Sequence, residues 1–80
     1  MHTVYILYSA YLQRYYTGCT GLKLAERIRR HNSNHKGFTG KADYWAVVYS
    51  EEITDKDAAL RREKQIKKRG AKRFIKDQKA

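Results

Sequence analysis

Two segments near the start of the chain have the composition of β-strands and are joined by a short connection. Residues 3–9, Thr-Val-Tyr-Ile-Leu-Tyr-Ser, are rich in β-branched and aromatic side chains, which favour an extended, half-buried backbone. Residues 14–18 form a second short segment, and only residues 10–14 connect the two. The sequence therefore predicts that the two strands pair as a hairpin, with Gly18 and Gly21 marking the exit from it.

The pattern changes to a helical period after this hairpin. Leu24, Ala25 and Ile28 form an apolar stripe with basic residues around it, which predicts a helix from residue 22 to about residue 32. The polar residues 33–41 then predict a loop with two glycines and several hydrogen-bond donors.

The second half of the chain predicts one more strand and two helices. Residues 43–53 contain the run Trp-Ala-Val-Val-Tyr, and we expect this third strand to be the most buried. Thr54 is expected to cap a helix over 55–69, because its hydroxyl can accept a hydrogen bond from the first turn. Gly70 breaks this helix, and a short terminal helix is expected over 71–77.

These elements predict an α/β (α+β) fold with the order β-β-α-β-α-α. The expected architecture is a three-stranded, mostly antiparallel sheet flanked by helices. Eighty residues are enough for one domain, which we expect to span residues 1–80. The core of so small a domain hides few polar residues without a reason.

The charge of the chain favours a polyanionic partner. Eighteen Lys and Arg against eight Asp and Glu give a net charge of +10 and a pI near 10.0. Such an excess favours phosphate-rich partners through counterion release, so nucleic acid is the leading candidate, and charge alone does not separate DNA from RNA. A membrane surface is disfavoured, because the sequence has no transmembrane-length apolar run, signal peptide or lipidation motif.

Several kinds of site are disfavoured by what the sequence lacks. The single Cys19 excludes an intramolecular disulfide and a Cys-based zinc cluster, so we expect a reducing, cytoplasmic setting and a packing role for this thiol. The sequence has no glycine-rich nucleotide loop and no Ser-His-Asp elbow motif. A two-metal nuclease needs a cluster of carboxylates, and the chain has only eight Asp and Glu residues, which argues against such a site. A mechanism with one metal ion stays open.

Glu63 is a carboxylate on the apolar stripe of the 55–69 helix. At 100° per residue it falls on the same face as Ala59, Leu60 and Ile66. A carboxylate there is costly unless it is paired or bound to a cation. Two interpretations stay open: a metal ligand, or a structural residue that pairs with Arg27 or lies at the rim of the core.

Arg27 and His31 are four residues apart and share one flank of the first helix. An Arg could neutralise the charge that develops on a phosphate under attack, and a His could move a proton. The alternatives are a solvated basic face, preferred for Arg29 and Arg30, and a capping or core-rim role for His31.

Tyr5 and Tyr16 lie on the two paired strands, where alternation can direct both phenols to one face. A phenol loses its proton only near pH ~10, so a tyrosine that acts as a base needs a cation nearby. Ordinary sheet packing is the alternative for both residues, and it is the expectation for Tyr8, Tyr11 and Tyr15.

In this order, the segments resemble the GIY-YIG nuclease superfamily, and specifically its small single-domain bacterial members of the YhbQ-like type. Thr3-Val4-Tyr5 and Tyr16-Thr17-Gly18 match the two namesake motifs, with ten residues between the two tyrosines. Residues 24–32 are similar to the family's Arg-bearing helix, and residues 59–64 to its metal-binding Glu helix. The resemblance extends from residue 3 to about residue 76.

The resemblance implies a role for each residue. Glu63 would hold one divalent cation, Mg²⁺ or Mn²⁺, and Tyr5 would act as general base on the attacking water. Arg27 would stabilise the transition state, while Tyr16 and His31 would position phosphate and water. The expected activity is metal-dependent cleavage of DNA phosphodiester bonds.

The sequence departs from the family pattern at some positions. Thr3, Val4 and Thr17 replace residues of the two namesake motifs, and we treat these changes as conservative because those positions supply no catalytic side-chain chemistry. No Asn follows Glu63, although many active relatives carry one near the C-terminus. Larger relatives attach a DNA-binding or regulatory domain, so a protein partner that supplies specificity is an expectation here.

Basic residues outside the core are the expected contacts with nucleic acid: Arg29, Arg30, Lys36 and Lys41. The main alternative to an endonuclease is a nucleic-acid-binding module with the same fold and little or no catalysis. A protein associated with RNA is the third interpretation.

Overall fold

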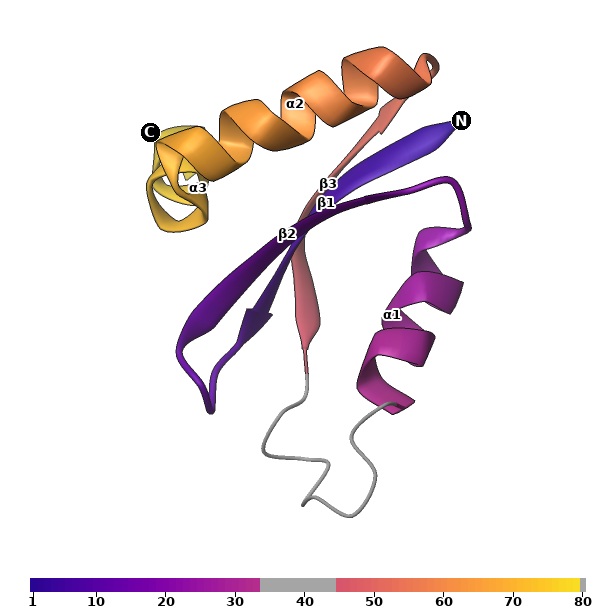
Figure 1. The fold of residues 1–80 in the computed structure, drawn as a ribbon. Helices are drawn as coiled ribbons and strands as arrows, with labels where there is room; N and C mark the ends of the chain where they lie inside the picture. Colours follow the sequence, from indigo (N-terminus) through magenta and orange to yellow (C-terminus); the bar gives the residue numbers. More distant parts are fainter. Residues whose placement is uncertain (34–44, 80) are drawn as a thin grey trace.

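The computed structural model describes residues 1–33 and 45–79. Its elements have the predicted order β-β-α-β-α-α, which confirms the fold class (Figure 1). They are β1 (His2–Ser9), β2 (Arg14–Thr20), α1 (Leu24–Ser33), β3 (Ala46–Ile53), α2 (Lys56–Arg69) and α3 (Ala71–Lys79). No helix among these described residues is long and apolar enough to cross a membrane.

The three strands form one antiparallel sheet with the order β2-β1-β3. The predicted hairpin is confirmed, with Tyr5 opposite Gly18 and Leu7 opposite Tyr16. In Figure 1, α1 lies on one side of the sheet, and α2 and α3 lie on the other. The sheet therefore separates the residues that face α1 from those that face the C-terminal helices.

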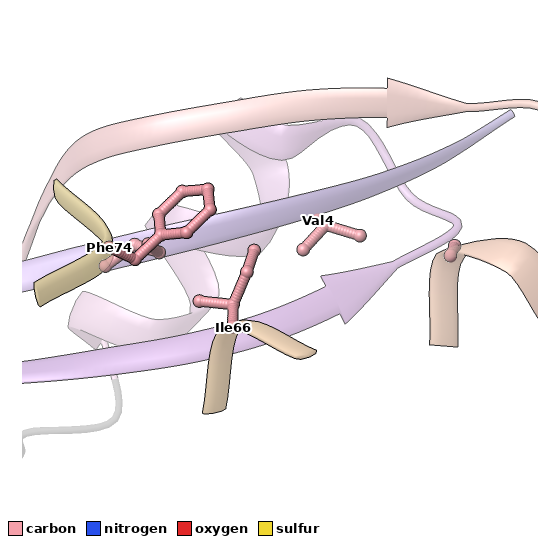
Figure 2. Packing of buried hydrophobic residues seen from close by; sticks show 5 residues of the cluster. Val4, Ile66 and Phe74 are labelled. Carbon is pink, nitrogen blue, oxygen red and sulfur yellow. The ribbon is translucent and has the colours of Figure 1, made fainter. Parts of the chain in front are cut away.

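Alternation along β1 divides its side chains between two covered faces. Val4 and Ile6 pack with the buried residues Ala59, Ile66 and Phe74 of the C-terminal helices. Ile66 and Phe74 meet Val4 on this face of the sheet (Figure 2). The residues between them on β1, among them Tyr5, belong to the opposite face and are buried as well.

The expectation that the third strand is the most buried is wrong. β1 is the central strand, whereas β3 is an edge strand whose Val47 and Val48 are 41% and 44% exposed. The run Trp-Ala-Val-Val-Tyr is apolar, but an apolar run is buried only where other elements cover both faces of its strand. Both faces of β1 are covered in this way.

The cap of α2 differs by one residue from the prediction. Asp55, not Thr54, is the N-cap, and its carboxylate accepts a hydrogen bond of 2.9 Å from the amide of Ala58. Both residue types can cap a helix, and the extended backbone of Asp55 brings its side chain to the first turn. Gly70 ends α2 as predicted, with a φ of 94° that favours glycine.

An ion pair between Arg69 and Asp77 joins the two C-terminal helices. Arg69 donates two hydrogen bonds to the carboxylate of Asp77, at 2.9 and 3.1 Å. The hydrogen bond from Arg69 holds the pKa of Asp77 below its ordinary value. This ion pair links the last turn of α2 to the last part of α3.

Candidate active site

Tyr5 lies on the face of β1 that turns away from the C-terminal helices, and it is 1% exposed. Its ring covers Gly18, the residue opposite it on β2. A Cβ atom added at Gly18 would lie 2.6 Å from the Tyr5 hydroxyl oxygen. The absence of a side chain at this position therefore lets the phenol lie against the neighbouring strand.

Arg27 reaches Tyr5 from α1. Its Nε–H donates a hydrogen bond of 3.3 Å to the Tyr5 hydroxyl, across 22 residues of sequence. This hydrogen bond raises the pKa of Arg27, and a nearby Tyr16 acts in the same direction. The guanidinium therefore keeps its positive charge beside both phenols.

Tyr16 completes a cluster on this face of the sheet. Its ring centroid lies 6.4 Å from the ring of Tyr5 and 6.4 Å from that of Trp45. Tyr16 is 38% exposed, in contrast to the buried Tyr5. Tyr5 and Tyr16 thus share one face, as the alternation of the two strands predicted, Arg27 joins them from α1, and solvent reaches the cluster at Tyr16.

Glu63 belongs to α2, which covers the other face of the sheet. Its side chain is 17% exposed and forms an ion pair of 3.0 Å with the Nζ of Lys67, one helical turn further on. Burial raises the pKa of Cys19, and the charge of Glu63 adds to the effect, so this carboxylate lies near Cys19. The sequence left open an ion pair between Glu63 and Arg27, but in the structure Glu63 pairs with Lys67.

The tyrosine cluster and Glu63 lie on opposite faces of the sheet. Gly18 lies under Tyr5, and Cys19 is the next residue along the same strand. Successive residues of a strand point to opposite faces, and β2 is an edge strand, so its outer edge is open to both faces.

The described residues contain no group of three or more His, Cys, Asp and Glu side chains that could hold a metal ion. A single carboxylate suffices only for a cation that keeps most of its water and binds the substrate's phosphate, as Mg²⁺ does. Glu63 is the carboxylate that would have to meet this requirement, and its partner in the structure is the ammonium of Lys67.

The remaining candidate residues are described only in part. Arg29 is exposed on α1, and Arg30 and His31 belong to the same helix with side chains outside the described set. Lys36 and Lys41 lie outside the described residues.

Trp45 and Lys67 are two site neighbours that the sequence reasoning missed. The spacing of Lys67 four residues after Glu63 was the available signal for the ion pair. For Trp45, the only signal was an aromatic residue directly before an apolar strand.

Comparison with protein families gives one match. Residues 1–76 match the family described as GIY-YIG catalytic domain. Searches of curated proteins and of solved structures found no match.

Proposed function

The chain belongs to the GIY-YIG family, and on that premise we propose that it is an endonuclease that hydrolyses DNA phosphodiester bonds with one divalent cation. Membership indicates nuclease activity, a nucleic-acid substrate and the general use of a divalent metal. The choice of DNA, the hydrolysis and a preference for Mg²⁺ or Mn²⁺ are our proposal. So are the YhbQ-like type, the cytoplasmic location and a protein partner that supplies specificity. The observation that carries the proposal is the contact of Arg27 with Tyr5 beside the exposed Tyr16.

Arg27 is the residue that stabilises charge in this proposal. Its Nε–H is held by the Tyr5 hydroxyl, so the fork of the guanidinium has a fixed direction before substrate binds. Preorganised positive charge beside a phosphate favours the transition state, in which the equatorial oxygens carry more negative charge. Tyr5 therefore acts as a positioning residue for Arg27.

The exposure of the two phenols favours Tyr16 as the group that meets the attacking water. The resemblance implied Tyr5 as the general base, but Tyr5 is 1% exposed and Tyr16 is 38% exposed. In our proposal Tyr16 reacts as its phenolate: the phenolate oxygen takes a proton from the water as the water oxygen bonds to phosphorus, and the bond to the leaving oxygen breaks, with that oxygen taking a proton from solvent. Arg27 lies close enough to counter negative charge on that phenol.

Glu63 is the residue that would hold the divalent cation. A cation bound there would neutralise charge on the scissile phosphate at the edge of β2. Lys67 must leave the carboxylate first, since its ammonium is 3.0 Å away. His31, one turn after Arg27 on α1, is proposed to help position the phosphate, and Arg29, Arg30, Lys36 and Lys41 to bind the flanking DNA.

A nucleic-acid-binding module with little or no catalysis is the second candidate. The observation that favours it is the ion pair of Glu63 with Lys67, because an occupied carboxylate can serve a structural role. In that case binding would fall steeply with salt and would not depend on Glu63 or on EDTA.

Glu63→Gln separates the two candidates, because it keeps the shape of the side chain and removes its charge. We expect wild type to nick supercoiled plasmid with Mg²⁺ or Mn²⁺ and not with EDTA, and Glu63→Gln to lose both nicking and calorimetric Mn²⁺ binding. Glu52→Gln is the matched control, since it removes the same charge from an exposed position on β3. Undiminished metal-dependent nicking by Glu63→Gln would contradict the assignment of the ligand.

A further inference from the structure

A groove of about 520 Å³ runs between β2 and the junction of α2 and α3. Tyr15 and Tyr16 line it from β2, Lys67 lines it from α2, and Gly70 and Lys72 line it from the junction and the start of α3.

The lining of this groove carries positive charge and no acidic residue. Two other hollows on the described part of the chain combine opposite charges. The larger, of about 720 Å³, has both Lys23 and Glu52 in its lining, and the other has Lys23, Arg29 and Glu26. The groove beside β2 is therefore the one of these three hollows whose lining is suited to a polyanion.

The surroundings of the groove extend this positive charge. The last turn of α2 carries three basic residues in succession, Lys67, Lys68 and Arg69. Lys72 and Arg73 follow in the first turn of α3 and are exposed. The sequence predicted contacts with nucleic acid from α1 and from the residues after it. It did not predict them from α2 or α3.

Tyr16 belongs to both the groove and the candidate active site. It faces Tyr5 through its ring, and it also lines the groove on the outer edge of β2. A chain of phosphates that follows the groove past Lys72 and Lys67 therefore reaches the residue that we assign to the attacking water. A groove that combines lysines with tyrosine rings has the composition of sites that bind single strands.

We propose that this groove binds a single strand of DNA, with Lys67 and Lys72 on its phosphates, and leads the strand to Tyr16. The proposal rests on the proposed function in its choice of DNA and of the direction toward Tyr16. Lys67 connects the two sites, because the same ammonium pairs with Glu63 and lines the groove. A phosphate that draws Lys67 into the groove leaves the Glu63 carboxylate free for a cation.

The test is a binding titration in EDTA with a labelled oligothymidine, which excludes cleavage from the readout. The full chain would be compared with the double variant Lys67→Ala/Lys72→Ala. The control is Lys56→Ala/Lys64→Ala, which removes the same charge from exposed positions of α2 away from the groove. The logarithm of the affinity falls linearly with the logarithm of the salt concentration, and each phosphate contact to a single strand contributes about 0.7 to the steepness of this line. The groove variant lacks two such contacts, so its line should be less steep by about 1.4.

At an ionic strength of about 0.15 M this change corresponds to a loss of affinity of roughly tenfold. The control variant should keep the salt slope of wild type. Because Lys67→Ala leaves Glu63 without its partner, circular dichroism must show that the variant is folded. Lys72→Glu is a second variant that spares the ion pair, and it should also weaken binding.

Equal losses in the groove and control variants, or no loss in either, would overturn the proposal. A loss as large for a blunt duplex as for the oligothymidine would overturn the assignment to a single strand. Failure of the nuclease assay would leave this binding result standing, and failure of this binding test would leave the nuclease assay standing, since the two share no readout.

Discussion

Replacing Arg27 with alanine is expected to lower the single-turnover rate of DNA cleavage by roughly 10²–10³-fold, the usual effect of removing one preorganised transition-state contact. The guanidinium is held by the Tyr5 hydroxyl at 3.3 Å and stays charged beside both phenols. Its removal takes away the positive charge that we propose to face the scissile phosphate. The measurement is the cleavage rate at saturating protein. DNA affinity is measured beside it in EDTA, and it should fall by no more than the contribution of one phosphate contact.

Two further variants separate position from charge. Arg27→Lys keeps the charge but loses the planar fork that Tyr5 holds, so it should recover only part of the rate. Arg29→Ala removes the same charge from an exposed position on the same helix, and it should weaken binding without slowing cleavage at saturation. Cleavage by Arg27→Ala at the wild-type rate would mean that the cluster around Tyr5 is not the active site.

Adding a single methyl group at Gly18 is expected to damage both stability and cleavage. The new Cβ would lie 2.6 Å from the Tyr5 hydroxyl oxygen and 2.7 Å from the ring carbon that bears it, and real Cβ atoms do not approach so closely. The ring of Tyr5 cannot simply move away, because it is buried and its hydroxyl accepts a hydrogen bond from Arg27. Overpacking of this kind costs about 1–3 kcal/mol of unfolding free energy.

Thermal unfolding of Gly18→Ala measures this cost. In a domain of this size each 1 kcal/mol lowers Tm by about 4–8 °C. Gly21→Ala is the matched control, since its Cβ would meet His2 only at 3.5 Å, an ordinary contact, and should change Tm little. A Gly18→Ala protein as stable as wild type would show that the Tyr5 ring does not lie against β2 as described.

The shared face of Tyr5 and Tyr16 was within reach of the sequence because it depends on local periodicity, whereas the contact of Arg27 with Tyr5 joins residues 22 apart. Period-2 alternation fixes which side chains of a hairpin share a face, and a helical turn fixes where Arg27 lies on α1. The same argument gave the order of the elements, which the structure confirms.

What the sequence could not supply depends on contacts between distant segments. The composition of the third strand predicted deep burial, but strand order decides burial, and β3 lies at the edge. The choice between Thr54 and Asp55 as cap depended on backbone geometry at one residue. Glu63 was correctly placed near an apolar face, yet both its partner and the side of the sheet from which α2 presents it required the packed fold.

The exposure of the two tyrosines also lay beyond the sequence. Each belongs to one of the two namesake motifs, but β1 is central and β2 is at an edge. The burial of Tyr5 and the exposure of Tyr16 follow from that order, and with them the division of roles that we propose.

The most direct test of the account is the single-turnover cleavage rate of Tyr16→Phe, measured with saturating protein and Mg²⁺ or Mn²⁺ beside its DNA affinity in EDTA. This change removes one hydroxyl and keeps the ring that packs between Tyr5 and Trp45. The account predicts a rate lowered by at least about 10²-fold, the usual contribution of a general base, with DNA affinity unchanged. Cleavage by Tyr16→Phe at the wild-type rate would contradict it.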